Sequence, residues 1–233
     1  MQLHTQQQQG ILHKRYKRFL ADIDLPDGKR LTVHCPNSGS MKGCSAPGSP
    51  VIISHSDNPK RKYSWTLEMV QASGVWVGVN TSLTNKIVAE ALENGTIDEF
   101  GKLDTIHAEV KTSLGTRLDF RVHAQGQPVY IEVKNCSLAE GHTALFPDAV
   151  TTRGTKHLLE LARLHEAGNA AAVLFCVQRA DADRFSPAAH IDPEYAKTLW
   201  AVHDKGVQVL IYQARVTPQA ITITNKLPLS ENS

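Results

Sequence analysis

Two carboxylates and a lysine stand on neighbouring apolar segments that are separated by a short turn-forming stretch. Asp119 lies within residues 117–120, and Glu132 and Lys134 lie within residues 130–134. In a β-strand alternate side chains share a face, so Glu132 and Lys134 point the same way while Val133 packs on the other side. The turn allows Asp119 to lie across from Glu132. Carboxylates at that distance repel each other unless a cation lies between them.

This arrangement of charges favours a divalent metal ion and the hydrolysis of phosphodiester bonds. Mg²⁺ and Mn²⁺ prefer oxygen ligands and keep several waters, so we expect Asp119 and Glu132 to be the metal ligands. Lys134 beside the ion would orient a water, stabilise a phosphoryl oxygen or help to activate the nucleophile. The alternative is a strand edge that carries a solvated Glu–Lys pair, because such pairs are common. Glu109 is a candidate third catalytic acid, or else an exposed strand residue.

Basic residues follow this motif at the start of an expected helix. Arg153, Lys156 and His157 fall on its first turns, near the end of the strand that bears Glu132. They could hold a phosphate or the strand to be cut, together with the free backbone N–H groups of the helix start. Without the neighbouring motif, the same residues would be interpreted as a solvated face of an amphipathic helix.

Two basic clusters near the start of the chain indicate a nucleic-acid-binding surface. The first comprises Lys14, Arg15, Lys17 and Arg18, and the second comprises Lys60, Arg61 and Lys62. Tyr16, Phe19, Tyr63 and Trp65 stand among or beside them. Basic groups contact phosphates and aromatic rings stack on unpaired bases. The alternative is two solvated charge runs with aromatic residues in the core, since strand alternation cannot turn Lys17 and Arg18 toward one groove.

The first third of the chain predicts a small β-barrel. We expect residues 1–10, which are polar and glutamine-rich, to be a frayed tail. Short strands are expected at residues 19–23, 30–34, 51–54 and 75–79, with Asp27-Gly28 as a hairpin turn between the first two. Several short strands without a long helix are typical of an oligonucleotide-binding (OB) barrel.

From about residue 80 the pattern changes to alternating helices and strands. A helix is expected after Asn80 or Thr81 and is ended by Gly95, followed by strands at residues 105–111, 117–123 and 129–135. Next we expect a helix from about residue 150 and a strand at 170–177 that is buried on both faces. A helix that begins at Asp192-Pro193 and strands at 207–216 and 221–224 complete the chain. The fold class is therefore α+β in two domains, an OB-like domain at residues 1–82 and an α/β domain with a mixed sheet at 83–233.

Bulk properties exclude several classes of protein. The formal net charge is only +2, so bulk charge does not identify a nucleic-acid-binding protein. No apolar run is long enough for a transmembrane helix, and the polar start has no apolar signal region. The four cysteines are scattered without C-x-x-C spacing, which favours reduced thiols and a cytoplasmic protein.

Asp119, the residues that separate it from Glu132, and Glu132-Val133-Lys134 resemble the sequence motif of the PD-(D/E)xK nuclease superfamily. The core of that superfamily is a helix, a meander that carries the motif, and a further helix. The leading proline is replaced by Leu118. The resemblance implies a PD-(D/E)xK nuclease-like second domain.

More of the chain is similar to the sugar fermentation stimulation protein A family. The matching stretches are RYKRFLAD (15–22), CPNSGSM (35–41), DNPKRKY (57–63), YIEVK (130–134), FPDAVTTRGTKHL (146–158), RFSP (184–187) and HID (190–192). Ser38 stands where this family often has threonine, which keeps the hydroxyl. The resemblance implies a bacterial or archaeal cytoplasmic protein with an OB-like domain, a nuclease-like domain and DNA binding of little sequence preference. It also implies a proposed role in regulating maltose genes.

Three hypotheses follow for the function. The first is a nuclease that depends on Mg²⁺ or Mn²⁺, with DNA as substrate and with single strands or RNA as alternatives. The second is a DNA-binding regulator of sugar metabolism genes that does not cut DNA. The presence of all three of Asp119, Glu132 and Lys134 argues against this hypothesis. The third, a sugar-metabolising enzyme or sugar sensor, has no sugar-site signature behind it. The pattern indicates no membrane partner and leaves self-association open.

Overall fold

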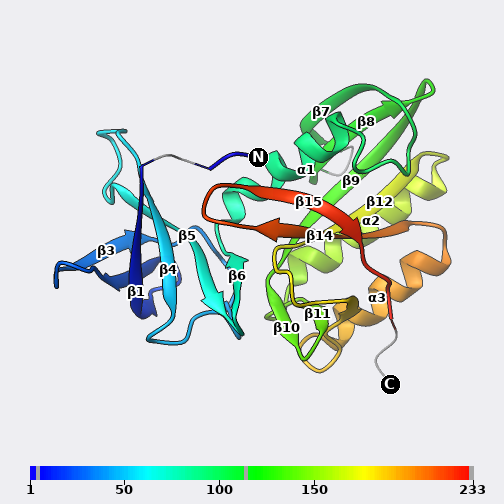
Figure 1. The fold of residues 1–233 in the computed structure, drawn as a ribbon. Coiled ribbons are helices and arrows are strands. Elements are labelled where there is room, and N and C mark those ends of the chain that lie inside the picture. The colour runs from blue at the N-terminus through cyan, green and yellow to red at the C-terminus, as the bar shows by residue number, and fades with distance from the viewer. Residues whose placement is uncertain (4–5, 113–114, 231–233) are drawn as a thin grey trace.

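The computed structural model describes residues 1–3, 6–112 and 115–230, which form two domains side by side (Figure 1). Within the described residues of the first domain, the regular elements are all strands. They are β1 (Gln7–Tyr16), β2 (Leu20–Asp24), β3 (Arg30–His34), β4 (Pro50–His55), β5 (Trp65–Ala72) and β6 (Val75–Gly78).

These strands form the barrel that the sequence predicts. Their order is β3-β2-β1-β4-β5-β6, and a parallel pairing of His34 in β3 with Thr66 in β5 closes the sheet on itself. This contact shortens the exposed sheet edge at which unpaired backbone groups would otherwise remain. The interior is filled by aliphatic side chains such as Leu12, Ile53 and Leu67, all of them fully buried. The turn between β2 and β3 uses Gly28 with φ +82°, as the Asp27-Gly28 pair predicts.

The expectation of a frayed tail over residues 1–10 is wrong for residues 1–3 and 6–10, while residues 4 and 5 lie outside the described residues. Residues 7–10 are the first half of β1 and pair with β4, from Gln7 opposite Ser54 to Gly10 opposite Val51. The first residues reach the other domain, where Leu3 N donates to the carbonyl of Gln219 at 2.9 Å. The glutamines lack apolar alternation because this segment is held by backbone hydrogen bonds, which leave no mark in a hydrophobic pattern.

The second domain is built on a mixed sheet of order β15-β14-β12-β9-β8-β7. Its elements are a 3₁₀ turn (Thr81–Leu83), α1 (Thr84–Glu93), β7 (Leu103–Lys111), β8 (Arg117–Ala124), β9 (Gln127–Cys136), β10 (Leu138–Glu140), β11 (Thr143–Phe146), α2 (Thr152–Glu166), β12 (Ala170–Val177), β13 (Arg184–Pro187), α3 (Pro193–Asp204), β14 (Gln208–Val216) and β15 (Ile221–Lys226). Strands β7, β8 and β9 form the expected antiparallel meander. Strands β9, β12 and β14 are parallel, as their separation by helices requires.

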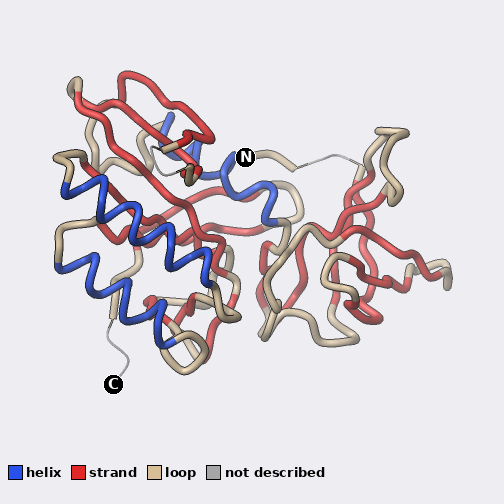
Figure 2. Tube along the Cα trace, turned by 180° about the vertical axis from the view of Figure 1, so that it is seen from behind, coloured by secondary structure: helices blue, strands red, loops and turns tan. Residues whose placement is uncertain are grey.

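Helices cover both faces of this sheet. The paired helices α2 and α3 lie on one face (Figure 2), and α1 lies on the other beside the first domain. Strand β12 is buried on both faces from Ala171 to Val177, as its apolar run predicts. The small sheet β10-β11-β13 was not expected. No helix among the described residues is long and apolar enough to cross a membrane, and all four cysteines are free and buried.

Candidate active site

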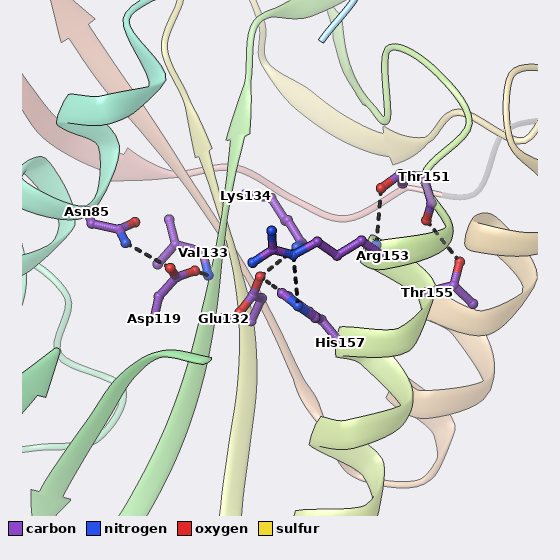
Figure 3. A network of polar contacts seen from close by, with 10 residues as sticks. Asn85, Asp119, Glu132, Val133, Lys134, Thr151, Arg153, Thr155 and His157 are labelled. Atoms are coloured by element: carbon purple, nitrogen blue, oxygen red, sulfur yellow. Dashed lines mark hydrogen bonds and ion pairs between the residues drawn. The ribbon is translucent and has the colours of Figure 1, made fainter. Parts of the chain in front are cut away.

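The meander brings Asp119 and Glu132 together where β8 and β9 separate from one another. Phe120 pairs with Ile131 in the antiparallel register, so the preceding Asp119 and the following Glu132 lie next to each other on adjoining strands. Figure 3 shows their carboxylates on either side of Val133, with Lys134 above Glu132. Beyond Ile131 strand β9 is paired with β12 alone, with Glu132 opposite Val173 and Lys134 opposite Phe175, and this pairing fixes the backbone that carries both residues. The predicted juxtaposition of the three residues is present.

Both oxygens of the Asp119 carboxylate accept hydrogen bonds from neighbouring elements. The backbone N–H of Val133 donates to Oδ2 at 2.7 Å, and Asn85 Nδ2 from α1 donates to Oδ1 at 2.8 Å. The pKa of Asp119 is nevertheless raised above its usual value, because burial and the negative charge of Glu132 both disfavour the ionised form. A nearby cation would remove this penalty.

The two oxygens of the Glu132 carboxylate have different surroundings. Oε1 accepts from Lys134 Nζ at 2.7 Å and from His157 Nδ1. Oε2 is buried and has no hydrogen-bond partner among the described residues, and Glu132 as a whole is only 4% exposed. Burial alone would raise the pKa of Glu132, but the hydrogen bond from His157 and the charge of Lys134 outweigh it and lower the pKa. Glu132 is therefore an ionised, buried carboxylate with one oxygen left for another partner.

These oxygen atoms fit a hard divalent cation. A buried unpaired carboxylate oxygen costs free energy unless a donor or a metal ion satisfies it. Asp119 retains further lone pairs beside it, since each carboxylate oxygen accepts more than one bond. Within the described part of the chain, no group of three or more His, Cys, Asp or Glu side chains is placed to hold a metal. Two carboxylates with completion by water is the coordination that Mg²⁺ commonly adopts.

Glu109 does not join the two acids. Its strand β7 pairs with β8 as expected, and its neighbours Ala108 and Val110 pair with Phe120 and Leu118. The backbone at Glu109 is in the left-handed region with φ +53°, and the exposed carboxylate accepts from Arg117 Nη1 at 2.9 Å. The structure thus places Glu109 in an exposed ion pair, which is the alternative that the sequence left open.

Helix α2 presents its first turns to Glu132, but the three basic residues there differ in their roles. His157 is buried and donates from Nδ1 to Glu132, since a carboxylate can only accept. Its Nε2 accepts from Arg153 Nε at 3.4 Å. Arg153 extends over the site (Figure 3), whereas Lys156 is exposed on the helix surface. The oxygen of Thr151 caps the helix by accepting from Gly154 N at 3.1 Å.

Asn85 was not among the predicted site residues. It is held in the first turn of α1, which follows the first domain directly in the chain. A lone asparagine at a helix start is usually a capping residue, so its type carried no signal for a role beside Asp119. The link becomes visible only in the fold, where the first turn of α1 lies beside the start of β8 and the end of β9.

In the first basic cluster, Arg15 bonds to the protein itself. Its guanidinium donates to the carbonyls of Ser40, Arg18, Asn37 and Gly39 at 2.8 to 2.9 Å. Lys17 and Arg18 form the exposed turn between β1 and β2, with φ of 47° and 62°. The exposed ring of Phe19 follows them. Because Lys17 and Arg18 lie in a turn, both side chains are exposed at the same end of the barrel. In a strand, neighbouring side chains would have pointed to opposite faces.

The second basic cluster lies on the loop between β4 and β5. Arg61 Nη2 donates to Thr66 Oγ1 at 2.6 Å, while Lys60 and Lys62 are exposed. Lys62 Nζ lies 5.6 Å from the centroid of the Tyr63 ring. Trp65 packs edge-on against His55, with ring centroids 5.0 Å apart. This cluster therefore offers two exposed lysines.

Comparison with known proteins agrees with both domains. The family model described as the SfsA N-terminal OB domain matches residues 14–79, and the sugar fermentation stimulation protein RE domain matches residues 82–220. The chain belongs to the sugar fermentation stimulation protein family. A homologue from Desulfotalea psychrophila is 55% identical over 91% of this chain and 90% of its own length. One from Pelobacter propionicus is 51% identical over 94% of this chain and 96% of its own.

A solved member of this family has the same fold. The structure of Pyrococcus furiosus SfsA in complex with Ca²⁺ superposes with a TM-score of 0.90 at 21% sequence identity, covering 99% of this chain and 98% of that one. The two-domain architecture is therefore maintained at low sequence identity.

Proposed function

We propose that this protein hydrolyses phosphodiester bonds of nucleic acid at a site where Asp119 and Glu132 hold Mg²⁺ or Mn²⁺. The observation that carries the proposal is the buried Oε2 of Glu132, which has no hydrogen-bond partner among the described residues and lies beside a second carboxylate. The P. furiosus protein was solved in complex with Ca²⁺. This supports the proposal, because Ca²⁺ is also a hard cation with oxygen ligands.

The residues around the ligands have separate tasks in this proposal. The bound ion would supply a nucleophilic water and neutralise charge on the phosphate. Lys134 Nζ uses one donor on Glu132 and has others for a phosphoryl oxygen as negative charge develops there. His157 and Lys134 hold Glu132 through the same oxygen, which leaves Oε2 as the atom that would bind the ion. Arg153, which extends over the site, would contact the phosphate.

The test is a cleavage assay with single-stranded and duplex DNA and with RNA, in Mg²⁺, Mn²⁺ or EDTA. Wild type should cut only with the metal, and Lys134→Ala should lose at least about a hundredfold in rate, comparable to the loss of one charge-stabilising donor. Lys205→Ala, which removes an exposed lysine paired with Glu166 at the far end of α2, serves as the control. Equal rates for wild type and Lys134→Ala would rule the proposal out.

A second candidate is binding of DNA with little sequence preference and without cleavage. The exposed Lys17, Arg18 and Phe19 at one tip of the barrel favour it, since cations contact phosphates and a ring can stack on a base. This function predicts salt-dependent binding that EDTA does not change. Retention of full affinity after neutralising Lys17 and Arg18 together would exclude it.

A further inference from the structure

Two loops from different domains meet next to the candidate active site. They are residues 37–41 of the barrel and residues 146–151, which precede α2. Met41 N donates to Asp148 Oδ2 at 2.8 Å, and Ser40 Oγ donates to the Asp148 carbonyl at 2.7 Å. A Cβ at Gly39 would lie 2.7 Å from both carboxylate oxygens of Asp148. A side chain at position 39 would force the Asp148 carboxylate to move, so the contact depends on the local sequence of both loops.

The barrel loop is held in place before any ligand arrives. Asn37 Nδ2 donates to the carbonyl of Val79 at 3.1 Å, and its Oδ1 accepts from Gly39 N at 2.8 Å. The Arg15 guanidinium holds the carbonyls of the same loop. A loop fixed by this many bonds provides a preformed wall, which lowers the entropic cost of binding.

Between the two loops lies a pocket of about 280 Å³ that opens beside Lys134. Its lining includes Ser38 from the barrel, Lys134 and Asn135 from β9, and Phe146 and Val150 from the second loop. Both domains and the end of β9 therefore contribute to it. Its volume is close to the lower limit of about 300 Å³ for small-molecule sites, which suits one nucleotide better than a base pair.

The pocket offers both polar groups and apolar surface. Asn135 Oδ1 accepts from Thr84 Oγ1 at 3.1 Å and from Gln178, which leaves its Nδ2 for a ligand. The Ser38 hydroxyl is on an exposed residue at the pocket wall. Val150 is 70% exposed at the rim although it is apolar, and Phe146 is half-buried beside it. The amide and hydroxyl groups can bond to the polar edge of a base, and the apolar surface can pack against the face of its ring. The pocket therefore matches a nucleotide better than a phosphate alone.

We propose that this interdomain pocket receives a single unpaired nucleotide adjacent to the phosphodiester bond that the site hydrolyses. The inference rests on the proposed function and specifies its substrate class as single strands, flaps or frayed ends. A paired nucleotide must leave its stack to enter such a pocket, which has a free-energy cost, whereas an unpaired one avoids it. Lys134 would then contact the phosphate while the pocket holds the adjoining sugar and base.

Binding of thymidine 5′-monophosphate to the full chain in EDTA tests the pocket separately from cleavage. Wild type should bind it more tightly than inorganic phosphate. Ser38→Trp, which places an indole in the pocket from an exposed position, should weaken binding at least about tenfold. Leu159→Trp is the matched control, because Leu159 is another exposed position, on α2 outside the pocket, and it should bind like wild type. Val150→Glu, which adds a negative charge at the rim, is a second variant should Ser38→Trp not fold.

Either of two results would overturn the pocket assignment: equal affinity for the nucleotide and for inorganic phosphate, or wild-type affinity in both pocket variants. With Mn²⁺, wild type should cut a single-stranded oligonucleotide at least about tenfold faster than the same sequence in a closed hairpin duplex. Faster cutting of the duplex would also contradict the inference. If the protein binds the nucleotide selectively but cuts no substrate, the proposed function is refuted while the assignment of the pocket as a nucleotide site stands.

Discussion

Glu132 shows how neighbouring side chains can prepare one residue for a ligand. Lys134 and His157 both bond to Oε1, so the carboxylate is ionised and oriented while Oε2 is left without a partner among the described residues. Removing a carboxylate from water and satisfying only one of its oxygens is unfavourable. The protein without metal therefore retains an electrostatic cost at this residue, and a cation should relieve it.

Metal binding should accordingly stabilise the folded chain. Excess Mn²⁺ over EDTA is expected to raise the thermal midpoint of wild type, by an amount equivalent to about 2.7 kcal/mol at a hundredfold excess over Kd. Glu132→Gln should lose most of this shift. Glu109→Gln should retain it, because Glu109 pairs with Arg117 on the surface. A shift in Glu132→Gln as large as in wild type would show that the ion binds elsewhere.

Arg15 and Arg18 belong to one basic cluster in the sequence but should respond differently to substitution. Arg15→Gln removes charged hydrogen bonds to four loop carbonyls and should cost about 2 kcal/mol of stability. Arg18→Gln, in the exposed turn, should change stability by less than about 0.5 kcal/mol. It should instead reduce the slope of log affinity for DNA against log salt by about 1. Denaturation and salt titration of both variants provide the test, and a reversed pattern would contradict it.

Among the secondary-structure elements, those with clear apolar periodicity were predictable and those held by polar contacts were not. Strands 30–34 and 170–177 occur with the expected bounds, and the meander differs by one or two residues at its ends. Strand β5 was missed because its apolar run is interrupted by Glu68, which is buried and accepts from Ser54 and Asn80. Buried hydrogen bonds of this kind leave no periodic signal.

The candidate site shows the same division. Asp119, Glu132 and Lys134 were found because a hairpin brings nearby residues together, so sequence spacing reports spatial proximity. The bonds from Asn85 and His157 could not be inferred, since they depend on how α1 and α2 pack on the sheet. The bonding of Arg15 to loop carbonyls likewise depends on contacts made 22 to 25 positions later in the chain.

At the start of the segment between β12 and β13, Arg179 and Asp181 make a pH-sensitive contact. Arg179 is 2% exposed and donates twice to Asp181 at 2.7 Å and once to the carbonyl of Ser137. Burial would raise the pKa of Asp181, but the hydrogen bond and charge of Arg179 outweigh it and lower the pKa below 3.8. A lowered pKa stabilises the fold above the unfolded-state value and loses that contribution as the pH falls through the folded-state value.

Asp181→Asn should therefore destabilise the protein by about 3 kcal/mol at neutral pH, because it leaves a buried guanidinium without its charge partner. The difference from wild type should shrink as the pH falls below about 4, where wild type also loses the ionised carboxylate. Thermal midpoints measured across this range test the expectation. Asp183→Asn, beside exposed Arg184, is the control and should show little effect at any pH. A pH-independent difference for Asp181→Asn would contradict the expected linkage.

In the whole molecule, the two domains are joined by contacts that require small residues. The Cβ of a residue other than glycine at position 39 would collide with Asp148, and one at position 78 would overlap the side chain of Gln178. Gly78 N also donates to the Gln178 carbonyl at 2.9 Å. The domains therefore pack as closely as elements of one core, which gives their relative position little freedom.

Gly39→Ala should loosen this packing and destabilise the protein by about 1 to 3 kcal/mol, as overpacking usually does. In an Asp148→Ala background the same change should cost less, because the opposing carboxylate is gone. A double-mutant cycle on thermal or denaturant unfolding measures the difference. Ser38→Ala is the control at the neighbouring position. Strict additivity of the two changes would show that the Gly39–Asp148 approach does not restrict the interface.

The residues that precede β1 give the barrel an unusual attachment. Leu3 bonds to the turn before β15, whereas the barrel ends at β6 and the chain continues directly into α1. The chain on both sides of the barrel therefore contacts the second domain, through residues 1–3 and through the segment that follows β6. If the exposed turn of Lys17 and Arg18 binds nucleic acid, as the second candidate function holds, the two contacts would keep that turn at a high effective concentration relative to the other domain. A nucleic-acid strand bound by Lys17 and Arg18 would then reach the candidate active site without leaving the protein. The cleavage rate would depend less on repeated binding from solution.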